Sequence, residues 1–360
     1  MTDRLVCTVA TKAYLADVRV LAASLAEHAP GVPLVLLLAD RIDGYFDPES
    51  EPFRVVLLED LVDPDVVAQM TFYYRPFELC CALRGWLHTW ILDHASADRW
   101  LFLDGDVLVL DSLEPLWDRL DRAPILLSPH LLKPVEESKV RSHELLHLRL
   151  GMWNGGFLGL RRGETAASVA SWLRSRLARY GCDDPAAGQF VDQRWLDWLP
   201  IFFPEAAAVD DPGVNVAYWN LHERALARTE GGWTAGGSPL RFVHWSGWSH
   251  LQPHRLTGRN ADFQSAAGPI WRELAEQYRG RLLDAGVQET RTWPYAFADF
   301  HDGAPILDTM RRDHLRDLEA GVGSAVSPFD RSREFYRRHR APRRWLRRTG
   351  KRVLRAAGLR

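Results

Sequence analysis

Two aspartates that follow an apolar run could together hold a divalent cation. Asp104 and Asp106 flank one glycine directly after the apolar residues 100–103. Such a run is typical of a buried strand, and in open α/β sheets ligands bind at the carboxyl ends of the strands. Carboxylate oxygens are the ligands that hard divalent cations prefer. The alternative is a β-hairpin, since Asp-Gly between apolar runs is a strong turn signal; the cost of burying unpaired carboxylates favours the metal.

A histidine far along the chain could complete the same ligand set. His244 directly follows an apolar stretch and precedes Trp-Ser-Gly247. A mixed carboxylate and imidazole set is compatible with Mn²⁺, and Mg²⁺ is the other candidate. A lone histidine is more commonly a neutral core residue, so the sequence leaves both roles open for His244.

Two further motifs could line a ligand cleft. Residues 151–159 read Gly-Met-Trp-Asn-Gly-Gly-Phe-Leu-Gly, and glycines occur where the backbone approaches a ligand closely. A plain turn is the alternative. Asp192 and Gln193 stand at a predicted helix start, where Asp192 could equally well cap the helix.

The elements that must position these residues alternate between strands and helices. Apolar runs predict strands, and spacing predicts helices at 17–29, 76–94 and 164–180, with mostly helical chain beyond 260. The expected strands lie at 5–10, 34–39, 54–58, 100–103, 107–110, 157–160, 201–203 and 242–245. Continuous apolar strands between helices indicate a parallel sheet covered on both faces. The first 110 residues therefore form a Rossmann-like half, without the Gly-x-Gly-x-x-Gly turn of dinucleotide-binding proteins.

The order of the motifs resembles glycosyltransferases of the A-type (GT-A) fold, closest to family 8 and its bacterial relatives. The resemblance spans about residues 5–250, and it is carried by Cys-Thr-Val-Ala-Thr-Lys-Ala-Tyr14, Leu-Asp-Gly-Asp-Val-Leu, Trp-Asn-Gly-Gly-Phe-Leu-Gly, Asp-Gln and His-Trp-Ser-Gly. It implies an α/β chain with one Rossmann-like nucleotide-diphosphosugar transferase domain and a mostly parallel central sheet at 1–255. A helical extension at 256–330 and a basic amphipathic tail at 331–360 would follow.

The resemblance also implies a set of site residues and a reaction. Asp104, Asp106 and His244 would bind Mn²⁺ or Mg²⁺. Substrate and nucleotide would contact Thr8, Ala10, Tyr14, Asp104, Asn154, Gly155 and Gly156, and catalysis would involve Asn154, Asp192 and Gln193. From their places beside the aspartate motif, and not from the resemblance, we add Arg84 and Gly105 to the residues expected to contact substrate and nucleotide. The reaction would move a sugar, with retention, from a nucleotide-diphosphate sugar (a UDP-sugar foremost) to a glycan, lipid-linked or cell-surface acceptor. The alternative is a catalytically silent nucleotide- or sugar-binding relative that acts as a membrane-associated scaffold.

The cation that would face the diphosphate is not fixed by the sequence. The family carries Lys-Pro-Trp after His-Trp-Ser-Gly, and here the lysine is missing. Arg255 and Arg259 are the nearby substitutes. Arg84 or Arg75, before the aspartate motif, could also neutralise developing charge on a leaving group.

Composition places the chain among ordinary globular proteins. Its 360 residues are 46% hydrophobic and 26% charged, which excludes disordered, collagen-like and coiled-coil classes. No apolar run approaches the roughly 20 residues that span a bilayer. The amino terminus lacks the apolar core of a signal peptide, and the four cysteines lack metal-ligand spacing. We therefore expect a cytoplasmic protein with reduced thiols.

The basic tail predicts an anionic partner. Residues 331–360 hold thirteen Lys and Arg and one acidic residue, while the rest of the chain holds 32 basic and 46 acidic residues. Trp345, Leu346, Val353 and Leu354 lie among these cations, and basic amphipathic segments bind anionic membrane interfaces. We expect a peripheral position on the inner face of the membrane, with a solvated tail as the alternative. Nucleic acid is not an expected partner, because stacking aromatics are sparse.

Overall fold

The computed structural model describes residues 3–258, 268–322 and 326–338. The chain separates into two compact units, one made of residues 1–64 and 76–295 and the other of residues 65–75 and 296–360. The two units divide the chain at 64/65, 75/76 and 295/296. The domain boundaries expected at 255/256 and 330/331 remain predictions.

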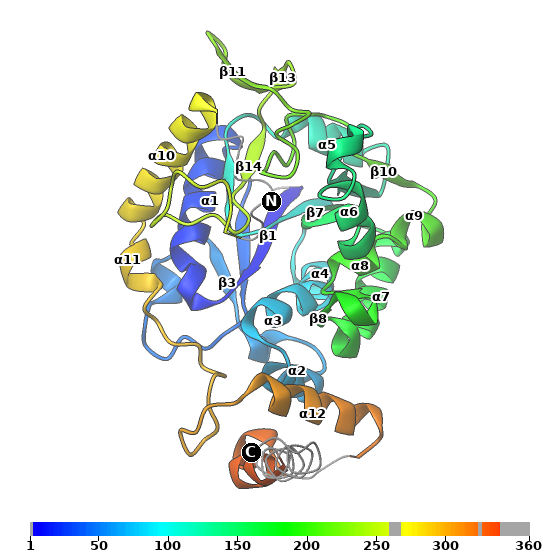
Figure 1. Ribbon diagram of the computed structural model, residues 1–360, viewed down its shortest axis with the longest axis vertical. Coiled ribbons are helices and arrows are strands. Elements are labelled where there is room, and N and C mark those ends of the chain that lie inside the picture. Colours follow the sequence, from blue (N-terminus) through cyan, green and yellow to red (C-terminus); the bar gives the residue numbers. More distant parts are fainter. Residues whose placement is uncertain (1–2, 259–267, 323–325, 339–360) are drawn as a thin grey trace, which may run out of the picture. The chain divides into compact units, whose positions relative to one another are not determined.

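A seven-stranded sheet forms the centre of the first unit (Figure 1). Its strands, in spatial order, are β10 (Ala206–Ala208), β6 (Ile125–Pro129), β7 (Trp153–Arg161), β4 (Arg99–Leu103), β1 (Arg4–Ala10), β2 (Leu34–Leu38) and β3 (Arg54–Val56). Only β7 runs antiparallel to its two neighbours in this sheet. The predicted α/β fold with a mostly parallel central sheet is therefore confirmed.

Helices cover both faces of the sheet because its strands are apolar on both faces. Along β4, Leu101 and Leu103 belong to one buried cluster with residues of α1 (Leu15–His28) and α5 (Glu114–Leu120). The alternate residues Trp100 and Phe102 contact His88 of α4 (Arg84–His94) on the other face. Successive strand residues point to opposite faces, so a continuous apolar run gives a strand buried on both sides.

The strand that follows the aspartate motif belongs to a second, two-stranded sheet. β5 (Val107–Val109) pairs antiparallel with β14 (Phe242–His244), and His244 lies opposite Val107. β4 and β5 therefore belong to different sheets, so the hairpin interpretation of Asp104–Asp106 is wrong. The pairing of β5 with a distant strand is what brings His244 beside the aspartates.

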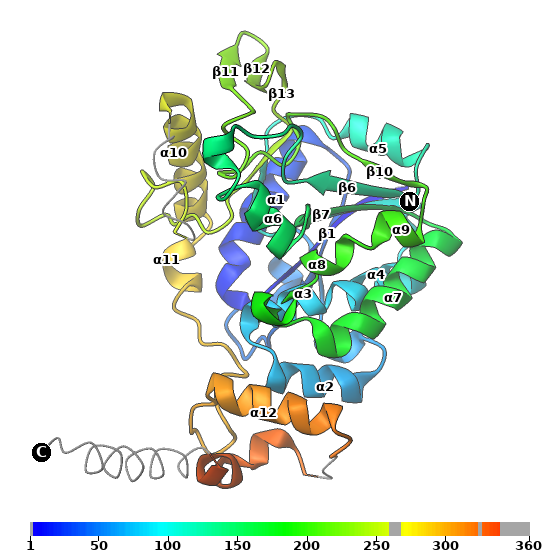
Figure 2. The same cartoon turned by 45° about the vertical axis from the view of Figure 1, so that its right-hand side comes forward.

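The remaining elements of the first unit complete its helical layers and edges. They are α3 (Pro76–Ala82), α6 (Glu144–Leu150), α7 (Glu164–Tyr180), α8 (Gln193–Leu196), α9 (Leu199–Phe202), α10 (Pro269–Asp284), α11 (Val287–Thr290), β8 (Asp183–Asp184), β9 (Gln189–Phe190), β11 (Leu226–Thr229), β12 (Gly232–Ala235) and β13 (Ser238–Pro239). Figure 2 shows α10 beside α1.

Two sequence predictions about these elements are wrong. The helix expected at 76–94 is interrupted at Leu83, which separates α3 from α4. The strand expected at 201–203 is instead the short helix α9, with Pro200 in its first turn. Trp198 stacks on Phe202 one turn later, and a short apolar run does not distinguish a strand from a helix by periodicity alone.

The second unit combines α2 (Pro64–Tyr73) with α12 (Asp308–Glu319) and a helical segment at 332–338. The buried Arg311 of α12 donates to the carbonyl oxygens of Phe72 and, at 2.6 Å, Phe297. Helices α10–α12 agree with the expected helical chain beyond 260. No helix among the described residues is long and apolar enough to cross a bilayer. Residues 339–360 of the predicted membrane-binding tail lie outside the described part of the chain.

Candidate active site

Three predicted metal ligands meet at the carboxyl end of β4. His244 Nε2 lies 3.5 Å from Asp104 Oδ2 and 3.3 Å from Asp106 Oδ1. One ligand atom from each residue lies within 4.8 Å of the others. Two carboxylates and one imidazole form the donor set expected for Mn²⁺ or another borderline-hard cation. The described residues therefore fit a divalent metal, and they favour the ligand role of His244 over a plain core role.

A chain of buried hydrogen bonds fixes which nitrogen of His244 faces the aspartates. His130 Nδ1 donates to the carbonyl of Met152 at 3.0 Å, so its Nε2 accepts from Asn154 Nδ2. Asn154 Oδ1 in turn accepts from Asn215 Nδ2 at 3.0 Å, and Asn215 Oδ1 lies 3.2 Å from His244 Nδ1. Asn215 Oδ1 thus accepts a hydrogen bond from the Nδ1–H of His244, which leaves the Nε2 lone pair for a metal.

Asn215 is a residue that the sequence analysis missed. Its side chain is buried and its φ is +57°, a left-handed conformation that asparagine tolerates better than most residues. Neither the spacing of the motifs nor the resemblance pointed to it, because it touches the metal ligand rather than the metal.

Two adjacent glycines on β7 leave room for the site. A Cβ added to Gly156 would lie 2.3 Å from His244 Cε1 and 2.8 Å from Asp104 Oδ2. A Cβ on Gly155 would lie 2.9 Å from Arg84 Nη1 and 3.2 Å from Asp192 Oδ2. The glycines of this motif are therefore required by close approach to the functional side chains, and the plain-turn alternative does not apply to them.

Gly156→Ala should separate metal binding from folding. The added methyl group must push His244 away from Asp104, so we expect Mn²⁺ affinity to fall about 10- to 100-fold. Gly268→Ala is the control, because Gly268 has open space around it and no positive φ. The nearer Gly163 is unsuitable, since alanine would be strained at its positive φ. A calorimetric Mn²⁺ titration of both alanine variants should show weakened binding for Gly156→Ala alone, and equal affinities would contradict the close approach.

Arg84 joins the metal ligands to the other predicted catalytic residues. Its Nη2 donates to Asp104 Oδ1 at 2.6 Å, while its Nη1 donates to Asp192 Oδ2 at 2.5 Å and to the Gly155 carbonyl. The guanidinium lies 4.3 Å from the centre of the Phe102 ring. This buried side chain holds three acceptors around one fixed charge, a task that suits the planar fork of arginine.

Arg84 and the carboxylates that it contacts shift each other's pKa values. Burial raises the pKa of the Asp192 carboxyl above its ordinary value, and the Arg84 guanidinium opposes that rise. The two carboxylates in turn raise the pKa of Arg84, against the effect of its burial. Asp192 makes no side-chain cap to α8 and instead pairs with Arg84, so the capping alternative is wrong.

Gln193 lies against the glycine strand. Its Oε1 accepts from the backbone N–H of Gly155 at 3.1 Å, and its Nε2 donates to the Leu150 carbonyl at 3.0 Å. Asn154 Nδ2 lies 3.5 Å from the same Oε1. The structure thus brings Asn154, Asp192 and Gln193 together with Arg84, although their catalytic roles remain predictions.

The residues expected to hold the nucleoside gather at the end of β1. An ideal Cβ on Gly105 would lie 3.8 Å from Thr8 Oγ1 and 3.9 Å from Ala10 Cβ, so these three residues are neighbours. Thr8 and Ala10 are buried, whereas Tyr14 in the 3₁₀ turn η1 (Lys12–Tyr14) is 48% exposed. Tyr14 therefore has the most accessible side chain of the predicted nucleoside residues.

The other candidate cations have different surroundings. Arg75 belongs to the second unit, where it lies 3.9 Å from Asp308. Arg255 is exposed, and Arg259 lies outside the described residues. Arg84, by contrast, forms an ion pair with the predicted metal ligand Asp104.

Buried histidines lie behind Asn154. His147 stacks on His130 with ring centres 4.0 Å apart, and burial lowers the pKa of His147 to about 4. The pKa of an unfolded histidine is about 6.5. Between these values the unfolded chain binds a proton that the folded chain excludes, so stability present above pH 6.5 is lost as the pH falls toward 4.

His147→Phe should therefore flatten the acid dependence of stability. The phenyl ring keeps the stacking volume without a titrating group, and the loss of unfolding free energy between pH 7 and pH 4.5 should shrink by about 2 kcal/mol. Urea unfolding at several pH values measures this, with the exposed His254→Phe as the control. Parallel curves for His147→Phe and the wild type would contradict the assignment.

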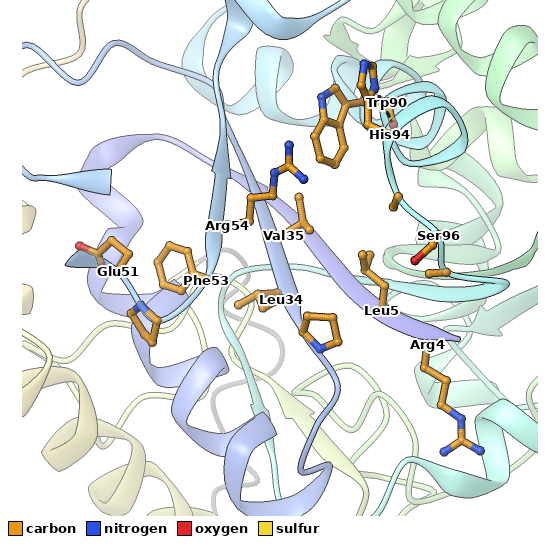
Figure 3. Close-up of a pocket in the computed structure, with 14 residues that line it drawn as sticks. Arg4, Leu5, Leu34, Val35, Glu51, Phe53, Arg54, Trp90, His94 and Ser96 are labelled. Atoms are coloured by element: carbon orange, nitrogen blue, oxygen red, sulfur yellow. Dashed lines mark hydrogen bonds between the residues drawn. The ribbon is translucent and has the colours of Figure 1, made fainter. Parts of the chain in front are cut away.

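A pocket of about 530 Å³ lies at the opposite edge of the sheet (Figure 3). Its lining includes Arg4 and Leu34 at the amino ends of β1 and β2, together with Arg54 and Trp90. It contains none of the predicted site residues. The chemistry-bearing group instead lies at the carboxyl ends of the strands, where open α/β sheets bind ligands.

Comparison with known proteins finds relatives of about half of this chain. No family model matches the chain. It is 30% identical to human glycogenin-1 over 187 residues, 50% of this chain and 52% of that protein. It is 25% identical over 175 residues to the uncharacterized protein YfnF of Bacillus subtilis (strain 168), 48% of this chain and 57% of that protein. The chain thus matches only about half the length of these curated relatives.

Solved structures give matches over more of the chain. A structure of the galactosyltransferase LgtC in complex with donor and acceptor sugar analogs matches 77% of this chain and 99% of that one, with 22% identity and a TM-score of 0.46. The glycogenins are family 8 proteins. The predicted resemblance is confirmed by these relatives: the chain is related to the GT-A glycosyltransferases of family 8.

Proposed function

We propose that the protein is a metal-dependent glycosyltransferase. It takes a sugar from a nucleotide-diphosphate sugar, a UDP-sugar foremost, and transfers it to a glycan, lipid-linked or cell-surface acceptor. The observation that carries the proposal is the ion-pair chain in which Arg84 joins Asp104 of the candidate metal cluster to Asp192 of the expected sugar cleft.

Asp104, Asp106 and His244 would hold the metal, which is Mn²⁺ or Mg²⁺ in this proposal. A bound divalent cation neutralises negative charge on a diphosphate leaving group. Asp104 has two tasks, because Oδ2 faces His244 and Oδ1 accepts from Arg84. Asn215 keeps the Nδ1 proton of His244 away from the cluster.

The remaining residues would orient the sugar and stabilise charge. In the transfer, the bond between the anomeric carbon and the diphosphate oxygen breaks, the acceptor oxygen forms the new bond to that carbon, and the proton of the acceptor hydroxyl passes to the departing diphosphate. Arg84 supplies a fixed positive charge that needs no reorganisation during the reaction. The amide oxygen and the amide nitrogen of Gln193 are both hydrogen-bonded to the backbone. Gln193 would therefore present a polar surface to the sugar rather than a strong nucleophile.

Retention of the anomeric configuration is part of the proposal, and it rests on the resemblance to family 8. A hexose as the transferred sugar rests on the same ground. We also propose that the basic residues 331–360 hold the enzyme at an anionic membrane surface, close to a lipid-linked acceptor.

A donor-consumption assay tests the function. Purified protein with Mn²⁺ is incubated with UDP-glucose, UDP-galactose, UDP-N-acetylglucosamine, GDP-mannose and dTDP-glucose, and the released nucleoside diphosphate is measured. We expect slow hydrolysis of one donor in the absence of acceptor, and its loss when the metal is chelated. Tight binding of a nucleotide without any turnover, with or without added glycan acceptors, would instead support the silent scaffold.

A further inference from the structure

Arg291, which lies near the last residue of the first unit in sequence, contacts the turn that follows β1. Its guanidinium carbon lies 3.8 Å from the centre of the Tyr14 ring. The same guanidinium donates to the carbonyl of Ala13 and pairs with Asp17 at 2.7 Å. One side chain thus contacts a ring, the preceding backbone and the first turn of α1.

The partners of Arg291 are themselves fixed. Asp17 is buried, and it also accepts from the hydroxyl of the buried Tyr278 at 3.4 Å. The carboxylate of this ion pair is therefore buried, although the Arg291 side chain remains 29% exposed. A charged hydrogen bond to a buried group holds its geometry more strongly than one at the surface. Arg291 follows α11 directly, and α11 packs against both α1 and η1.

The first residue of the same turn is fixed by separate contacts. The fully buried Lys12 donates to the Arg41 carbonyl at 3.0 Å and to Asp40 at 3.3 Å. Lys12 and Arg291 thus both tie η1 to other parts of the fold, and Tyr14 lies at its end with about half of its surface exposed.

We propose that Arg291 is a positioning residue that holds the Tyr14 ring as a platform for the base of a nucleoside diphosphate. This inference rests on the proposed function, since it requires that a nucleotide binds beside η1. An aromatic side chain gains affinity by stacking on a base. A cation fixed against the ring restricts its motion before the base arrives, so less conformational freedom is lost on binding.

The test separates the base from the diphosphate. Arg291→Met keeps most of the side-chain length and removes the charge, and Arg291→Lys keeps the charge beside Asp17 while removing the planar stack on Tyr14. Calorimetry measures the binding of UDP and of inorganic pyrophosphate, each with Mn²⁺. Arg281→Met is the matched control, because Arg281 of the neighbouring helix α10 also forms an ion pair with α1, at the exposed Glu27.

Both Arg291 variants should bind UDP about 10-fold more weakly than the wild type and pyrophosphate equally well. Tyr14→Ala should give the same selective loss, and the double variant Tyr14→Ala/Arg291→Met should lose little more than either single variant. Equal losses for UDP and pyrophosphate, or unchanged UDP binding, would overturn the positioning role. A wild type that binds neither ligand would overturn the proposed function and this inference together, whereas Arg291 variants can fail alone.

Discussion

Asp106→Asn should lose Mn²⁺ binding and sugar transfer while keeping its fold. Asparagine preserves the shape of the side chain but replaces one of the two carboxylates that face His244 Nε2. Removing a ligand should weaken Mn²⁺ binding at least as much as losing an outer partner does, by about 100-fold or more. Asp106 is partly exposed, with 24% of its side chain accessible, so the substitution leaves no uncompensated buried charge.

Metal titration and thermal unfolding together measure this prediction. Asp121→Asn is the control, because that aspartate pairs with Arg99 at the surface and has no contact with the cluster. We expect transfer activity to fall in proportion to metal occupancy for Asp106→Asn and to stay unchanged for Asp121→Asn. Normal Mn²⁺ affinity in Asp106→Asn would show that the three residues do not form a metal site.

Of the substitutions proposed, Arg84→Met should lower the free energy of unfolding the most. It would leave Asp192 buried without its guanidinium partner, and breaking a buried ion pair by removing one member typically costs about 3–5 kcal/mol. Arg84→Lys keeps one positive charge, but an ammonium group has no planar fork to bridge Asp104, Asp192 and the Gly155 carbonyl together. We therefore expect Arg84→Lys to fold and to lose about 100-fold or more in turnover.

A double variant separates the two roles of Arg84. Asp192→Asn removes the deepest carboxylate of the group, so Arg84→Met/Asp192→Asn should recover part of the stability that Arg84→Met loses, without recovering activity. Chemical unfolding and donor turnover measure the two readouts. Wild-type turnover in Arg84→Lys, or wild-type stability in Arg84→Met, would contradict the central place given to this arginine.

The candidate metal cluster could be predicted because two of its residues stand at the ends of strands: Asp104 directly follows β4, and His244 is the last residue of β14. Asp104 and His244 each come directly after an apolar run, and the ends of strands in an α/β fold converge on one edge. The spacing of Asp104 and Asp106 therefore carried information about chemistry. The same reasoning could not exclude a hairpin, because the partner of β5 is β14, more than a hundred residues downstream.

The supporting residues could not be predicted in this way. Asn215 and Arg291 act through side chains that belong to other motifs, and their roles depend on contacts across the fold rather than on local pattern. Arg84 could be named as a candidate because it precedes the aspartates, yet its choice over Arg75 became clear only from the ion pairs. The helix α9 was mistaken for a strand because four residues are too few to show a period.

Calorimetric titration of nucleoside diphosphates tests the central claim most directly. UDP, GDP, CDP, dTDP and ADP are each titrated into the wild type with and without Mn²⁺, and the best of them is repeated with Asp106→Asn. The proposed site predicts binding of one diphosphate in the micromolar range only with the metal, and loss of that binding in the variant. Absence of binding to every diphosphate by demonstrably folded protein, or equal binding without metal, would contradict a metal-dependent donor site.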